Sequence, residues 1–213
     1  MDLFDGVQTP RQLQLANGAW LLPSFALHNE AEIISDLKQI ISQSPPQHMV
    51  TPGGFSMSVA MTNCGKLGWV TDRTGYRYEV LDPSTGEPWQ AMPVSFLQLA
   101  NMAAAASGFA NFMPDACLIN RYKPSARMTL HQDKDERDFT QPIVSVSFGV
   151  PAVFLFGGFE RADKALRLSL NHGDVVVWGG AARLRYHGVM RLKISHHAAF
   201  GDCRINLTFR KAQ

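Results

Sequence analysis

The chain has few of the features that mark secreted, zinc-binding or membrane proteins. Among its 213 residues are three cysteines, Cys64, Cys117 and Cys203, and no two of them have the close spacing of a disulfide framework or zinc site. No apolar run approaches the ~18 residues that a membrane helix needs. The first residues, Met1–Thr9, are acidic and lack the apolar core of a signal peptide. We therefore expect a cytoplasmic protein with reduced thiols and no membrane association.

The chain also has little net charge. It is +2 at pH 7, which by itself does not predict nucleic-acid binding, so any attraction for phosphate must come from local clusters of basic residues. Hydrophobic residues make up 46% of the chain and charged residues 18%, which is enough to bury an ordinary core. Its length suggests one domain over residues 1–213, which we expect to be a monomer.

Two helices are expected in the N-terminal half. Isoleucine and leucine repeat at helical spacing after Asn29, and Asn29 with Glu32 has the pattern of a capping box. Pro45 and Pro46 would end this helix. A second helix is expected over residues 93–106, with a proline in its first turn and a glycine soon after its end.

The remaining chain changes texture near its middle. Residues 51–89 are rich in glycine, and we expect mostly loops there, of the kind that cover binding sites. From Ala116 onward, short β-rich segments alternate with turn residues. The pattern indicates a mainly β fold with flanking helices (α+β) in the form of a sandwich or jelly roll.

The segment Leu130–Glu136, LHQDKDE, contains the first sign of chemistry. Residues two apart on a strand point to the same face, so His131 and Asp133 could supply an imidazole and a carboxylate to one metal ion. A distant His187 would complete a 2-His-1-carboxylate triad, which leaves open positions on Fe(II). A His-x-Asp triplet is nearly expected by chance, and a second one, His172 to Asp174, is interpreted as a turn.

The last strand raises the first triplet above chance. Arg204, Asn206, Thr208 and Arg210 alternate with apolar residues, so the polar set should face one cavity. Two buried guanidiniums are costly unless they meet an anion, and a dicarboxylate fits two arginines. Asn120 and Tyr122 share one face of another expected strand and could donate to the same carboxylates. The alternative is an exposed edge strand with solvated arginines.

Taken together, these residues resemble the AlkB family of Fe(II)- and 2-oxoglutarate-dependent nucleic-acid dealkylating dioxygenases, especially its bacterial members. The resemblance covers nearly the whole chain and is carried by the segments TPGG (51–54), GWVTDRTGYRY (68–78), PDACLINRY (114–122), LHQDKDE (130–136), PIVSVS (142–147), HGDVVVWGG (172–180), YHG (186–188) and RINLTFR (204–210).

The resemblance implies a double-stranded β-helix (jelly roll) core over residues 114–213. It implies an N-terminal extension with a nucleotide-recognition lid over residues 1–90. The implied ligands of Fe(II) are His131, Asp133 and His187. The implied contacts of 2-oxoglutarate are Asn120, Tyr122, Arg204, Asn206 and Arg210. The implied contacts of the nucleic acid are Trp69, Tyr76, Arg77, Tyr78, Asp135 and Arg161.

The implied reaction uses Fe(II), 2-oxoglutarate and O2 to demethylate N1-methyladenine and N3-methylcytosine in DNA repair, releasing formaldehyde, succinate and CO2. The base must be flipped out or single-stranded, and we expect it to stack between Trp69 and His131. Asp135 would favour a cationic base. The alternatives are a 2-oxoglutarate-dependent hydroxylase of a small molecule or protein side chain, and a binding module without turnover. DNA or RNA, single or double strand, and the range of lesions stay open.

Overall fold

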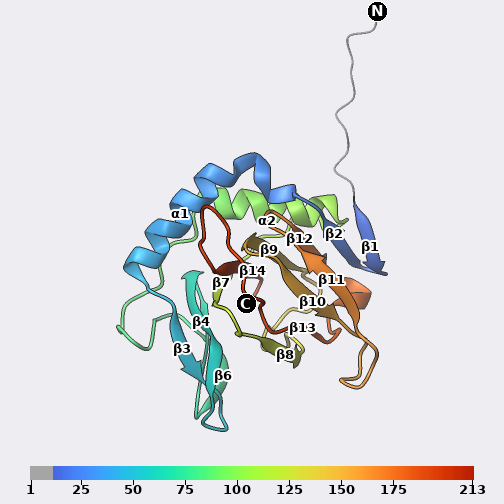
Figure 1. Cartoon of the computed structure of the whole chain (residues 1–213). Coiled ribbons are helices and arrows are strands. Elements are labelled where there is room, and N and C mark those ends of the chain that lie inside the picture. Colours follow the sequence, from blue (N-terminus) through green and yellow to red (C-terminus); the bar gives the residue numbers. More distant parts are fainter. Residues whose placement is uncertain (1–11) are drawn as a thin grey trace, which may run out of the picture.

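The computed structural model describes residues 12–213, so the expectation for Met1–Thr9 lies outside the described part. An eight-stranded antiparallel sheet forms the centre of the molecule (Figure 1). In the order of the sheet, its strands are β1 (Leu13–Ala16), β2 (Ala19–Leu22), β12 (Val175–Trp178), β9 (Ile143–Gly149), β14 (Arg204–Arg210), β7 (Ala116–Tyr122), β4 (Ser56–Gly65) and β3 (Gln47–Val50).

A second sheet of four strands packs against one face of the first. In order, it contains β11 (Leu166–Leu170), β10 (Ala152–Phe156), β13 (His187–Val189) and β8 (Met128–His131). A separate hairpin is made of β5 (Gly68–Asp72) and β6 (Gly75–Glu79). The two sheets are those of a jelly roll, so the predicted mainly β fold with flanking helices is confirmed.

Two helices cover the outer face of the large sheet (Figure 1). They are α1 (Glu30–Gln43) and α2 (Val94–Ala106), close to the predicted bounds, and short 3-10 turns lie at Phe25–Asn29 and Gly180–Ala182. Gly108, just after α2, has the positive φ of +85° that favours glycine. Asn29 is the residue before α1, but its side chain makes no capping hydrogen bond, so that detail of the prediction is wrong.

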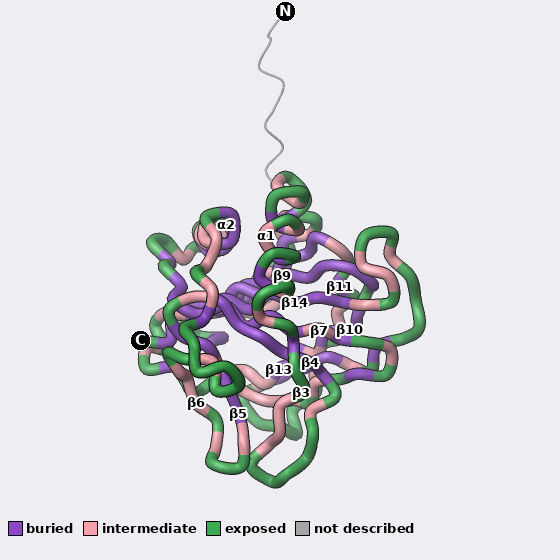
Figure 2. The backbone as a smooth tube through the Cα atoms, turned by 90° about the vertical axis from the view of Figure 1, so that its left-hand side faces the viewer, coloured by how far each residue is buried: buried purple, intermediate pink, exposed green. Residues whose placement is uncertain are grey.

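Side chains that alternate along the strands fill two main cores, one on each face of the large sheet. The residues of the central strands are drawn mostly purple, as buried, in Figure 2. Ile119, Leu207 and Phe209 point toward the helices and pack with Phe96 of α2. Leu118 and Tyr122 of β7 belong to the core on the other face, together with residues of β10 and β13. The polar residues that alternate with Ile119, Leu207 and Phe209 point away from the helices and therefore lie between the two sheets.

Residues 51–89 contain more strand than their glycine content suggested. β4 is ten residues long and pairs with β7 along most of its length, and β5 and β6 follow it. The buried side chain of Asn63 on β4 holds this hairpin, because it accepts from the backbone N–H of Trp69 and donates to the carbonyl oxygen of the same residue, both at 3.0 Å. The hairpin of β5 and β6 is thus tied to the large sheet. We call it the lid hairpin, because it lies within the lid region expected from the sequence.

The strands β1 to β4 extend the same sheet that β7, β9, β12 and β14 form, so the sheet continues across the predicted boundary between extension and core. Within residues 12–213, no helix has both the length and the apolar character needed to cross a membrane.

Candidate metal centre and the two cavities beside it

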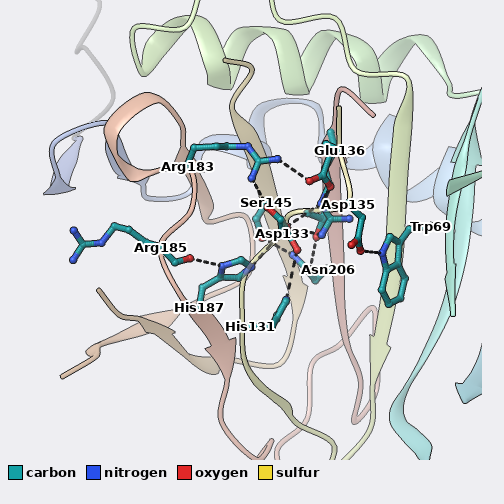
Figure 3. A network of polar contacts seen from close by, with 12 residues as sticks. Trp69, His131, Asp133, Asp135, Glu136, Ser145, Arg183, Arg185, His187 and Asn206 are labelled. Carbon is teal, nitrogen blue, oxygen red and sulfur yellow. Dashed lines mark hydrogen bonds and ion pairs between the residues drawn. The ribbon is translucent and has the colours of Figure 1, made fainter. Parts of the chain in front are cut away.

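The three predicted metal ligands come together. His131 is the last residue of β8 and His187 the first of β13, and the two are paired directly across these strands. Asp133 lies beyond the end of β8, so chain geometry after the strand brings it to the histidines, and not the two-residue repeat that we expected. Its carboxylate oxygens lie 3.7 Å from Nε2 of each histidine (Figure 3).

The histidines are oriented for binding a metal through Nε2. Nδ1 of His131 lies 2.8 Å from the carbonyl oxygen of Thr129, and Nδ1 of His187 lies 3.1 Å from that of Arg185. Each Nδ1–H can donate to its carbonyl oxygen, which leaves the Nε2 lone pair facing the other ligands. Burial lowers the pKa of His187 to about 3, so its imidazole is neutral at pH 7 and able to bind a cation.

Asp133 is held at both its side chain and its backbone. Arg210 donates to Oδ2 from Nε at 2.9 Å and from Nη2 at 2.7 Å, and Arg183 donates to the backbone carbonyl oxygen at 2.7 Å. Burial on its own would raise the pKa of Asp133, but the positive charges of Arg210 and Arg183 hold it below its usual range. The ligand set within residues 12–213 is therefore two imidazoles and a carboxylate, within 4.8 Å of one another.

A narrow cavity lies on one side of this triad, between the two sheets. Among its lining residues are Asn120, Tyr122, Arg204, Asn206 and Arg210, the side chains predicted to bind 2-oxoglutarate. Asn206 donates to Ser145 Oγ at 2.8 Å and to the backbone of Val146 at 2.9 Å. These contacts fix the floor of the cavity, so the polar face of β14 is buried as predicted and is not a solvated edge.

Arg204 carries the signature of an anion site. It is 1% exposed, and it donates from Nη2 to Ser147 Oγ at 2.9 Å while its guanidinium lies 5.0 Å from the ring centre of Tyr122. Its Nε and Nη1 are buried and have no hydrogen-bond partner in the described part of the chain. Because a buried, unpaired guanidinium is costly, this end of the cavity fits a carboxylate. The triad and the cavity together fit Fe(II) and a dicarboxylate.

A wider cavity of about 350 Å³ opens on the other side of the triad. Trp69 and Tyr76 of the lid hairpin line it together with His131, Asp135 and Arg161. The rings of Trp69 and Tyr76 are stacked at 5.7 Å, and Trp69 Nε1 donates to Asp135 Oδ2 at 2.8 Å (Figure 3). A cavity of this size with an aromatic wall and a carboxylate suits a flat, cationic, aromatic group.

Two predicted substrate contacts lie away from the residues that line this cavity. Arg77 is ion-paired with Asp72 at 2.8 Å and contacts Glu79, and Tyr78 donates to Glu136 Oε1 at 2.6 Å.

The second His-x-Asp triplet is a turn, as interpreted: the Asp174 side chain accepts from two backbone N–H groups. His172 stacks on His197, with ring centres 4.3 Å apart.

Sequence reasoning missed two residues behind the triad. Glu136 and Arg183 are both buried, and Nη2 of Arg183 lies 2.9 Å from Oε2 of Glu136. Glu136 belongs to a run of charged residues, and such runs are usually solvated. The available signal was the spacing of Asp133 and Glu136 within LHQDKDE, in the segment that supplies two metal ligands.

Comparisons with known proteins agree with this geometry. A family model described as the 2OG-Fe(II) oxygenase superfamily matches residues 18–210. The alpha-ketoglutarate-dependent dioxygenase AlkB of Escherichia coli (strain K12) is 57% identical over 212 residues, covering 100% of this chain and 98% of the relative. The human nucleic acid dioxygenase ALKBH1 is 33% identical over 128 residues, 60% of this chain and 32% of the relative.

A solved structure of OsALKBH1 superposes with a TM-score of 0.79 at 30% identity, covering 94% of this chain and 100% of that one. Alpha-ketoglutarate is another name for 2-oxoglutarate, so the likenesses in sequence and in structure point to the same cofactor set as the ligand geometry. The chain therefore belongs to the AlkB family of 2-oxoglutarate-dependent dioxygenases, within the 2OG-Fe(II) oxygenase superfamily.

Proposed function

We propose that this enzyme repairs nucleic acids by oxidative removal of alkyl groups from damaged bases, with N1-methyladenine and N3-methylcytosine in DNA as its first substrates and RNA as a further one. The observation that carries the proposal is the 350 Å³ cavity beside the metal triad, which has Trp69 and Tyr76 on its wall and Asp135 at its edge. The relatives named AlkB and nucleic acid dioxygenase ALKBH1 support the same substrate class.

The cofactors supply the oxidising power that no side chain has: with Fe(II), 2-oxoglutarate and O2 bound, an N-methyl group can be hydroxylated and lost as formaldehyde, with succinate and CO2 as co-products. In this proposal His131, Asp133 and His187 hold the metal ion. Arg204 pairs with the far carboxylate of 2-oxoglutarate, through the two guanidinium nitrogens that have no partner among residues 12–213. The remaining contacts of the diacid are Asn120, Tyr122, Asn206 and Arg210.

The lid residues would bind the damaged base. Trp69 offers a ring for stacking, which stabilises a flipped base by ~1–3 kcal/mol whatever its sequence context. Both N1-methyladenine and N3-methylcytosine are cationic near neutral pH, and a cation gains from aromatic faces and from the carboxylate of Asp135. Asp135 accepts from Trp69 here, so an exocyclic amino group of the base would share or replace that hydrogen bond.

A basic groove continues outward from the base cavity and would hold phosphates. Arg161 lines both cavities, and the outer groove is also lined by Arg127 and Arg191. All three arginines are exposed, no acidic residue lines the groove, and none of the three makes an ion pair within the described chain. Such groups would position a nucleic-acid strand without reading its sequence.

The test is release of formaldehyde from an oligonucleotide that contains N3-methylcytosine, incubated with the enzyme, Fe(II), 2-oxoglutarate and O2. His131→Ala should abolish release, since it removes a metal ligand. Succinate formed without repair of the base would favour the alternative, a hydroxylase of a small molecule or protein side chain. No succinate with any substrate would contradict turnover altogether.

We also propose that the enzyme acts in the cytoplasm as a monomer. Its proposed substrate and 2-oxoglutarate are both intracellular, and one chain supplies every residue of the metal triad and of the two cavities beside it.

A further inference from the structure

The metal ligand Asp133 belongs to a buried group of four charges, whose other members are Glu136, Arg183 and Arg210. Figure 3 shows Asp133 with Glu136 and Arg183. Glu136, whose side chain is 2% exposed, accepts from Arg183 at 2.9 Å and lies 3.4 Å from Nε of Arg210. The same two arginines hold Asp133, one at its backbone carbonyl oxygen and the other at its carboxylate. Glu136 is thus the shared partner of both groups that fix this metal ligand.

The lid hairpin reaches the same group of charges. Trp69 and Tyr78 are direct partners across β5 and β6, and each donates to one of two consecutive acidic residues in the segment after Asp133. Trp69 donates to Asp135 at 2.8 Å, and Tyr78 donates to Glu136 at 2.6 Å. Burial raises the pKa of the Tyr78 phenol well above its usual value of 10.0, so its hydroxyl stays protonated and remains a donor.

The two contacts of the hairpin differ in their surroundings. Asp135 is exposed at the edge of the base cavity, where a bound base can compete for it, whereas Glu136 is buried and out of reach of the substrate. The contact through Tyr78 can therefore persist when the base enters. It connects the lid to the metal ligand by a continuous path of hydrogen bonds and ion pairs.

Stability alone does not account for burying four charges. A buried ion pair is often no more stabilising than well-packed apolar residues of the same volume, because each charge must be removed from water. What the arrangement does provide is fixed geometry: Asp133 can turn neither its backbone nor its carboxylate while both arginines are held. Partners that orient a metal ligand in this way usually change metal affinity or activity by about 10- to 100-fold when they are mutated.

We propose that Glu136 is a positioning residue for the metal ligand Asp133, acting through Arg183 and Arg210, and that Tyr78 joins the lid to it. Neither residue touches the metal, the co-substrate or the base. The part concerning Glu136 rests on the metal triad alone. The part concerning the lid also rests on the proposed repair of nucleic-acid bases.

The first experiment measures Mn²⁺ binding to the purified protein by titration calorimetry, with no substrate present. Glu136→Gln keeps the shape but leaves two guanidiniums balanced by Asp133 alone, and Glu136→Asp keeps the charge but withdraws the carboxylate by one methylene group. Both variants should bind Mn²⁺ about 10- to 100-fold more weakly than the parent protein. Glu160→Gln alters an exposed carboxylate that makes no ion pair with any residue the structure describes, and this variant should bind Mn²⁺ normally.

Thermal unfolding of each variant shows whether the protein is folded when the metal is added. A folded Glu136→Asp with the parent's affinity would mean that charge alone matters, which overturns the positioning role. A folded Glu136→Gln with unchanged affinity overturns it as well.

The second experiment uses Tyr78→Phe, which removes one hydroxyl and keeps the ring. The KM for a lesion-bearing oligonucleotide should rise about tenfold, the effect of losing one hydrogen bond to a charged group, while Mn²⁺ affinity and the KM for 2-oxoglutarate stay unchanged. An unchanged KM for the oligonucleotide would overturn the link to the lid. If the parent protein releases no formaldehyde, the proposed function and this link fail together, but the Mn²⁺ titration still decides the role of Glu136.

Discussion

Arg204 and Arg210 face one cavity from opposite ends of β14, but only Arg210 has a carboxylate partner among residues 12–213. Arg210 contacts Asp133 and Glu136, whereas the acceptor for Arg204 is the neutral hydroxyl of Ser147. Two arginines on the same face of one strand therefore have different tasks: Arg210 completes the support of the metal ligand, and Arg204 is left for an anion from outside.

Replacing Arg204 should impair binding of 2-oxoglutarate above all. Truncating one member of a buried charge pair costs about 2–5 kcal/mol, so Arg204→Gln should raise the KM for 2-oxoglutarate at least about 30-fold. Succinate formation at varied 2-oxoglutarate concentrations measures this change. The KM for the oligonucleotide is the internal control and should not change. An equal rise in both constants would contradict the assignment.

Asp135→Ala should change the preference among bases more than the turnover of 2-oxoglutarate. The carboxylate lines the base cavity, is exposed and accepts a hydrogen bond from Trp69, and within residues 12–213 it makes no ion pair with the metal ligands. We expect the ratio of kcat/KM for N3-methylcytosine over a neutral alkylated base to fall about tenfold, since one charge–charge contact is lost. Formaldehyde release from both oligonucleotides gives the ratio. Equal losses on both substrates would contradict the role.

The alternation on β14 was predictable because both of its faces are buried, so that every second residue must suit either a core or a cavity. When four polar residues alternate with apolar ones along a strand, all four side chains point to the same face. Two arginines that point inward on that face indicate a ligand with two carboxylates. His131 and His187 could be matched because both belong to β-rich segments: His131 ends β8 and His187 begins β13.

The contacts beyond the ends of strands could not be derived in this way. Asp133, Asp135 and Glu136 follow β8 without regular structure, so no repeat says which of them is buried. Glycines between Thr51 and Trp89 suggested loops, but the hydrogen bonds of Asn63 and the pairing of β4 with β7 override that local preference. We expected Tyr78 to contact the nucleic acid, and no sequence pattern indicated that its hydroxyl donates to Glu136.

The groove arginines should control how binding depends on salt. Each phosphate contact on single-stranded nucleic acid contributes about 0.7 to the slope of log affinity against log salt concentration. Arg127→Ala combined with Arg191→Ala removes two such contacts. The slope, which is negative, should therefore become less steep by about 1.4 for an oligonucleotide long enough to reach the groove. Fluorescence anisotropy over a range of salt concentrations measures it. Lys38→Ala, on the exposed side of α1, removes a charge elsewhere and should leave the slope unchanged. A slope that is the same in all three proteins would exclude phosphate contacts in this groove.

The metal-free protein should lose stability as the pH falls from 6.5 toward 3, because His187 resists protonation only when it is buried. Its pKa is about 3 in the folded state, against 6.5 for an ordinary histidine. In this window the unfolded chain binds one more proton than the folded chain does at this residue, so acid favours unfolding. The contribution is about 1.4 kcal/mol per pH unit.

Asp133 also makes the folded protein less stable in acid, but only near and below its unfolded pKa of about 3.9. Measurements between pH 4.5 and 6.5 therefore separate the contribution of His187 from that of Asp133. Urea unfolding at several pH values gives the slope, and His187→Gln should flatten it by about 1.4 kcal/mol per pH unit, since glutamine cannot be protonated. His197, whose pKa is also lowered, remains in both proteins and cancels in the difference. If the variant keeps the full slope, the acid sensitivity arises elsewhere and the neutral, metal-ready state of His187 loses its support.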